Sequence, residues 1–159
     1  MSIAVMGIAA LVAWVVTALG GFVMLGQWIR RGGLRQQRSG ATRFSTGLVF
    51  SHFGLAAGGL VVWIAYLLTG QDRLAWVAFV LLIPVALLGF ILLARWIPVY
   101  RGRAVAAGAP RASASAGSVS GEAEPAERHL PVPVVVAHGL FAVVTVVLVL
   151  LTALGMSTG

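Results

Sequence analysis

The chain is built from four long apolar runs separated by polar segments. The runs cover residues 3–28, 44–69, 74–97 and 131–155, and Arg95 is the one charged residue within them. Each run exceeds the ~20 residues that a helix needs to cross the hydrocarbon core of a bilayer. A helix also satisfies its own backbone hydrogen bonds, as lipid requires. The pattern therefore predicts an all-α fold, a four-helix transmembrane bundle with up-down-up-down topology, as a single integral membrane domain.

The connections between the runs predict how the bundle sits in the membrane. Residues 30–43 hold five arginines and no acidic residue, and short arginine-rich loops face the cytoplasm. Residues 70–73 make so tight a turn that the second and third helices become antiparallel neighbours. We therefore expect a multi-pass protein of the cell membrane, with this turn and both termini outside.

A long polar segment, residues 101–130, separates the third run from the fourth. It consists mainly of Ala, Gly, Ser and Pro with scattered charges. Such a composition lacks the large apolar residues that would offset the entropy lost on ordering. We expect a disordered cytoplasmic linker here.

The composition limits which partners and cofactors are expected. The chain is 60% hydrophobic and 9% charged, against a charged fraction of ~25% in ordinary soluble domains, so the lipid bilayer is its main partner. All 11 basic residues are arginine; they lie between the apolar runs and not along one stripe, which favours lipid headgroups over nucleic acid. The absence of cysteine excludes disulfides, thiolate metal sites, iron–sulfur clusters and covalent c-type haem attachment.

Two histidines interrupt the apolar runs at one predicted depth. His52 lies eight residues after the start of the second run, and His138 lies seven residues after the start of the fourth. Because both runs begin at the cytoplasmic side, helical rise places both imidazoles ~10–12 Å into the membrane. The second and fourth helices of such a bundle lie diagonally across its core. The two histidines are thus expected to face each other, and ionisable groups at such a depth are functional by default.

Glycines on the other two helices fall in the same layer. Gly20 and Gly21 lie eight and seven residues before Trp28, and Gly89 lies seven residues before Trp96. Small residues at this level leave room for a flat molecule between the diagonal helices. The structural alternative is that the glycines only let helices approach closely and the histidines only hydrogen-bond between helices, at about 1 kcal/mol or less per contact.

The placement of His52, His138, Gly20, Gly21 and Gly89 resembles the four-helix b-type cytochromes of membranes. In that family, histidines on the second and fourth helices bind the haem iron, and glycines on the first and third make space for the ring. The resemblance implies one haem b, with the two histidines as metal ligands and the glycines as cofactor-binding residues. The chain departs from the diheme members because the outer half of every span lacks histidine, so at most one haem is implied.

The resemblance also implies a function and its partners. Arg43, Arg95 or Arg128 near the cytoplasmic ends would pair with haem propionates, since guanidinium matches carboxylate geometry. The function implied is electron transfer by a membrane-embedded haem protein or haem-bearing subunit, with a redox partner or a larger membrane complex; whether the chain is an enzyme stays open. The alternative is a non-enzymatic membrane scaffold or accessory subunit. A transporter ranks last because the spans hold no Asp or Glu for a proton relay, and two histidines are too few for a closed zinc site.

Overall fold

The structure is a computed structural model that describes residues 2–108 and 124–155, with side chains described outside residues 103–108. This part of the chain is helical and contains no strand, so the predicted all-α fold is confirmed. Its elements in order are α1 (Ile3–Arg30), α2 (Gly33–Ser39), α3 (Thr46–Thr69), α4 (Asp72–Gly108), the short 3₁₀ helix η2 (Ala126–His129) and α5 (Val132–Ala153).

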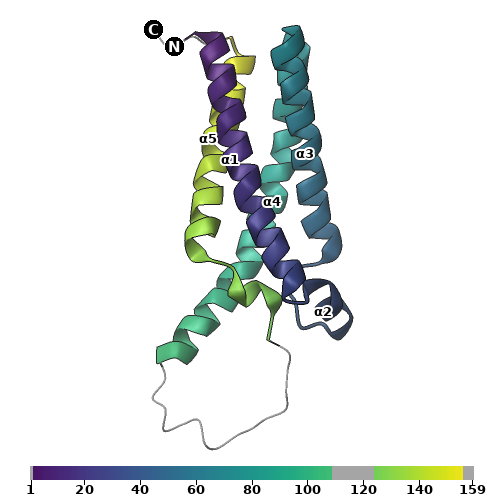
Figure 1. The fold of residues 1–159 in the computed structure, drawn as a ribbon, viewed down its shortest axis with the longest axis vertical. Helices are drawn as coiled ribbons and strands as arrows, with labels where there is room; N and C mark the ends of the chain where they lie inside the picture. Colours follow the sequence, from purple (N-terminus) through teal and green to yellow (C-terminus); the bar gives the residue numbers. More distant parts are fainter. Residues whose placement is uncertain (1, 109–123, 156–159) are drawn as a thin grey trace, which may run out of the picture.

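The four long helices form the bundle. By length and composition, α1, α3, α5 and the Asp72–Gly102 part of α4 are each able to cross a membrane, which makes the chain a membrane protein. Helix α1 packs mainly against α5 and α3 mainly against α4, and further contacts between α1 and α3 and between α4 and α5 close the ring. Helices α3 and α5 therefore lie on one diagonal, and the start of α1 and the end of α5 lie at the same end of the bundle (Figure 1).

The ends of the long helices agree with ordinary capping rules. The side chains of Ser2 and Ser45 accept hydrogen bonds from the backbone N–H groups at the starts of α1 and α3, which satisfies donors that have no partner within the helix. Gly70, with φ 66°, ends α3 in the left-handed conformation that favours glycine. The turn to α4 is therefore as short as predicted.

Helix α2 was not predicted, because residues 30–43 were interpreted as a plain loop. Its order depends on contacts with distant residues. The side chain of Gln36 donates to the carbonyl of Glu124 at 2.8 Å and accepts from the backbone N–H of Ala126 at 2.8 Å. Gly33 lies so close to the ring of Trp28 that a Cβ there would be 2.2 Å from Cε2. Packing at the end of the bundle thus stabilises a seven-residue helix that would be marginal alone.

The predicted disordered linker over 101–130 needs correction at both ends. Helix α4 continues to Gly108, well past the predicted end of its span at residue 97, and residues 124–130 form the ordered segment that contains η2. The physical reason is that this segment is pinned by hydrogen bonds and by the buried side chains of Ala126 and Leu130. The middle of the predicted linker, residues 109–123, lies outside the described residues.

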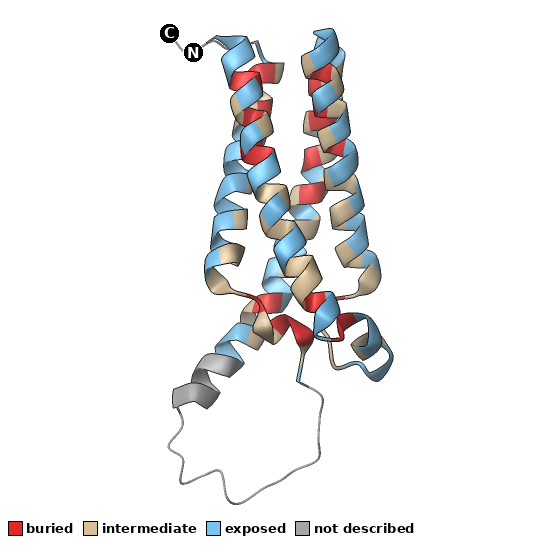
Figure 2. Cartoon of the chain, in the orientation of Figure 1, coloured by how far each residue is buried: buried red, intermediate tan, exposed pale blue. Residues whose placement is uncertain are grey.

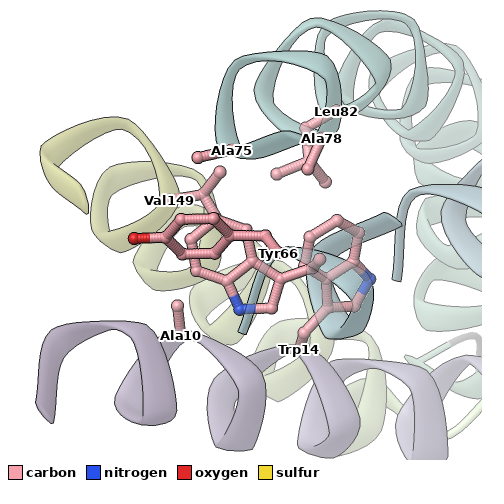
Figure 3. Close-up of a cluster of buried hydrophobic side chains, with 8 residues drawn as sticks. Ala10, Trp14, Tyr66, Ala75, Ala78, Leu82 and Val149 are labelled. Carbon is pink, nitrogen blue, oxygen red and sulfur yellow. The ribbon is translucent and has the colours of Figure 1, made fainter. Parts of the chain in front are cut away.

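Buried side chains gather in two clusters at opposite ends of the bundle (Figure 2). The first, here called the terminal cluster, lies at the end of the bundle where α1 begins and α5 ends, and Figure 3 shows side chains from all four long helices meeting there. Its centre is Trp63, whose Nε1 donates to the carbonyl of Gly7 at 3.2 Å. The members are Ala10, Trp14, Trp63, Tyr66, Ala75, Ala78, Leu82 and Val149.

The second cluster, here called the loop cluster, lies where the helices meet the two long connections. It joins the end of α1, the segments before α3 and α5, and the part of α4 around Trp96. The members are Trp28, Phe44, Trp96, Ala126 and Leu130. Because Ala126 begins η2 and Leu130 follows it, this cluster holds the start of α5 against the end of α1.

Candidate functional site

Between the two clusters lies a layer in which no side chain is buried. The layer comprises residues 15–27 of α1, 45–58 at and after the start of α3, 86–95 of α4 and 131–144 at and after the start of α5, all of them intermediate or exposed. Ten helical residues rise about 15 Å, so the layer is thick on the scale of a side chain. Protein interiors are normally close-packed. The described side chains of this layer are therefore less enclosed by the protein than those of the two clusters.

His52 and His138 both lie in this layer, on the diagonal helices α3 and α5. Nδ1 of His52 lies 2.9 Å from the carbonyl oxygen of Val85 on α4. Nδ1 of His138 lies 2.8 Å from the carbonyl oxygen of Thr17 on α1. A carbonyl oxygen only accepts, so both Nδ1 atoms must donate, and in each neutral imidazole the lone pair then resides on Nε2.

Neither Nε2 atom has a hydrogen-bond partner among the described residues. No buried side-chain nitrogen or oxygen in this part of the chain lacks a partner, so both Nε2 atoms must border open space. A bare lone pair in an apolar layer is costly unless something binds it. Donation from the other ring nitrogen to a backbone carbonyl is the usual setting of a metal-binding histidine, because it selects the tautomer and holds the ring.

The two imidazoles lie at a separation that suits one shared ligand atom. Their ring centres are 6.3 Å apart, and their planes are tilted by 56°. Two imidazoles that bind one metal ion through bonds of about 2 Å have ring centres about 6 Å apart. The observed separation therefore allows a single metal atom between the rings.

The predicted glycines lie in the same layer, but they contact the imidazoles themselves. A Cβ on Gly89 would be 3.2 Å from Cε1 of His52, and a Cβ on Gly21 would be 3.3 Å from Cε1 of His138. A Cβ on Gly20 would meet Cβ of His138 at 3.5 Å. From their positions in the sequence, we expect these glycines to make room for the edge of a flat molecule. In the structure they make room for the histidine rings.

The same local arrangement occurs twice. Gly21 follows Thr17 by four residues, and Gly89 follows Val85 by four residues, so each glycine is one helical turn beyond the carbonyl that a histidine binds. Without a side chain at that position, the imidazole edge reaches the helix backbone. The carbonyls of Thr17 and Val85 are site groups that sequence reasoning missed, although a glycine four residues further on was a usable signal.

Arg43 lies in the loop cluster region and is held there by its backbone. Its N–H donates to Oε1 of Glu127 at 2.6 Å, and its carbonyl accepts from Nη1 of Arg95 at 3.0 Å. No interaction connects the Arg43 side chain to either histidine within residues 2–108 and 124–155. Its role toward a propionate therefore stays a prediction.

The histidine pair is the one candidate site that the described residues offer for a metal. Within the described residues there is no group of three or more His, Cys, Asp or Glu side chains that would hold a metal ion, so the histidine pair stands as the candidate site. Comparisons with protein-family models, with curated proteins and with solved structures find no match for this chain.

Proposed function

We propose that the chain is a membrane-embedded b-type haem protein, or the haem-bearing subunit of a larger redox complex, and that it carries out electron transfer. One haem would be held between α3 and α5 by Nε2 of His52 and Nε2 of His138. The observation that carries this proposal is that two imidazoles with unpartnered Nε2 atoms lie on the diagonal helices α3 and α5, with their ring centres 6.3 Å apart.

The chain's own residues fit such a group. The carbonyls of Val85 and Thr17 orient the two imidazoles and increase the basicity of each Nε2. The apolar wall of the layer and the terminal cluster above it lower the local dielectric, which is one of the factors that set a haem potential. Haem, when bound, supplies an iron that takes up and releases one electron. The protein would hold it at a fixed depth in the membrane.

A second reading, a scaffold or accessory subunit, has one observation in its favour. Each histidine hydrogen-bonds the backbone of an adjacent helix, His138 to α1 and His52 to α4, and such contacts alone stabilise a bundle by about 1 kcal/mol or less. This hypothesis explains the hydrogen bonds that the two Nδ1 atoms make. It gives no reason for two Nε2 atoms that lack a hydrogen-bond partner among the described residues.

An absorption spectrum of the detergent-purified protein, oxidised and reduced, distinguishes the two readings. We expect a Soret band and the visible bands of low-spin, six-coordinate haem. His52→Ala and His138→Ala should each abolish the low-spin spectrum, while His129→Ala, in the loop segment beside Glu124, should leave it unchanged. A purified protein with no Soret band, or a low-spin spectrum that survives either ligand substitution, would contradict the proposal.

The cellular setting follows from the charge pattern. With arginine-rich segments on the cytoplasmic side, the loop cluster would lie toward the cytoplasm, and both termini would lie outside the cell membrane. Since the histidine layer is nearer to the loop cluster, electrons would exchange most readily with a redox partner on that side.

A further inference from the structure

Glu127 is the most completely buried charged side chain in the described part of the chain, with an exposed fraction of 0%. It lies in η2, within the segment expected to be disordered. Its Oε2 accepts from the hydroxyl of Thr42 at 2.7 Å, and its Oε1 accepts from the backbone N–H of Arg43 at 2.6 Å. Both oxygens are thus used to hold the segment that leads into α3.

The hydroxyl of Thr42 extends this contact to α1. Besides donating to Glu127, it accepts from Nε1 of Trp28 at 3.3 Å and from the backbone N–H of Phe44 at 3.2 Å. One carboxylate therefore ties together the end of α1, the start of α3 and the segment before α5. Hydrogen bonds to a charged acceptor are stronger than those between neutral groups, so this network stabilises the contact between these three segments.

The loop cluster shares residues with this network, and it has a member at the same spacing before each of the two histidines. Phe44 and Leu130 belong to the same loop cluster. His52 follows Phe44 by eight residues, and His138 follows Leu130 by eight residues. At 1.5 Å per residue, both imidazoles are carried about 12 Å from one common anchor.

We propose that Glu127 is a positioning residue that sets the depth and rotation of His52 relative to His138. A helix that slips by one residue moves its side chain by about 1.5 Å and turns it by about 100°. Either change would move the two rings away from the 6.3 Å separation at which they could bind one metal atom. Its importance for haem rests on the proposed function, whereas its effect on the distance between α3 and α5 does not.

The helix distance is measured first, without haem. The chain contains no cysteine, so spin labels on Ser51→Cys and Ala137→Cys, each one residue before a histidine and each exposed, report on α3 and α5 alone. In haem-free protein, Glu127→Ala should broaden the distance distribution or shift its maximum by about 1.5 Å or more. Glu124→Gln is the matched control, because it removes the same charge from an exposed side chain three residues away and should leave the distribution unchanged.

The second measurement is the haem spectrum of the same variants. Glu127→Ala should convert at least half of the low-spin signal to high-spin or lost haem, and Glu124→Gln should not. Glu127→Gln should fall between them, because its oxygen still accepts from Arg43 while the hydroxyl proton of Thr42 loses its acceptor. This isosteric variant also keeps the test valid if Glu127→Ala does not fold.

The outcomes separate the two proposals. If Glu127→Ala changes the distance distribution but the unaltered protein shows no haem spectrum, the positioning role is supported and the haem function is refuted. A distance distribution and a low-spin spectrum in both Glu127 variants that equal those of the unaltered protein would overturn the positioning role, whatever the chain binds.

Discussion

Substitution of Gly89 by alanine tests the contact between helix α4 and His52 directly. The added Cβ would lie 3.2 Å from Cε1 and 3.7 Å from Nδ1 of the imidazole, whereas carbon atoms in favourable contact are about 3.5–4.0 Å apart. The ring would have to move by about 0.3 Å or more. It is not free to do so, because its Nδ1 donates to the carbonyl of Val85 at 2.9 Å.

The expected magnitude is a difference between two opposing effects. Alanine in place of glycine stabilises a helix by up to about 1 kcal/mol, and an extra carbon in a tight contact costs about 1–3 kcal/mol. Gly54→Ala on α3 is the matched control, since nothing lies within 4 Å of a Cβ at that position, so only the favourable effect operates. We expect Gly89→Ala to be less stable than Gly54→Ala by about 1–3 kcal/mol.

The measurement is the free energy of unfolding of haem-free protein in detergent micelles, from denaturant titration followed by far-ultraviolet circular dichroism. Haem is left out so that the comparison reports on packing alone. Equal stability of the two variants, or a Gly89→Ala variant that is the more stable of the two, would show that the contact between the imidazole and α4 does not require glycine at position 89.

Two further predictions concern orientation and the terminal cluster. In intact cells, a cysteine at Gln71 should react with a membrane-impermeant maleimide and a cysteine at Arg38 should not, because arginine-rich loops stay in the cytoplasm; the reverse labelling would invert the proposed topology. Trp63→Phe removes a hydrogen bond to a backbone carbonyl of α1 and part of a fully buried ring, so we expect a loss of about 1–3 kcal/mol in unfolding free energy, whereas Trp76→Phe, at a 42% exposed position, should have little effect in the same assay.

The level of the candidate site followed from counting residues, but its chemistry did not. Counting from the ends of the apolar runs placed His52, His138 and the three glycines in one layer, and the structure brings them together there. The rotation of each helix about its axis decides which ring atom faces a neighbour, and the bonds from the Nδ1 atoms to the carbonyls of Val85 and Thr17 depend on that rotation. Residue spacing alone carries no information about it.

The polar segments were the least predictable part of the fold. Helix α2 and η2 are short, and each is ordered by side chains distant in sequence: Gln36 contacts residues 88 and 90 positions away, and Glu127 contacts residues 84 and 85 positions away. Composition described these segments as loop and linker because it registers only the local cost of ordering. It does not register hydrogen bonds with residues that are distant in the sequence.

The sequence by itself determined that this chain is an all-α membrane protein with four spans, because a backbone in lipid must satisfy its hydrogen bonds within each helix, and an uncharged run of sufficient length is a local property. The tertiary structure alone decided that the buried side chains gather at both ends of the bundle, that each imidazole rests on a glycine of an adjacent helix, and that Glu127 joins the segments that lead into α3 and α5. These features depend on which helices become neighbours and how each is rotated, and both are set by packing between residues far apart along the chain.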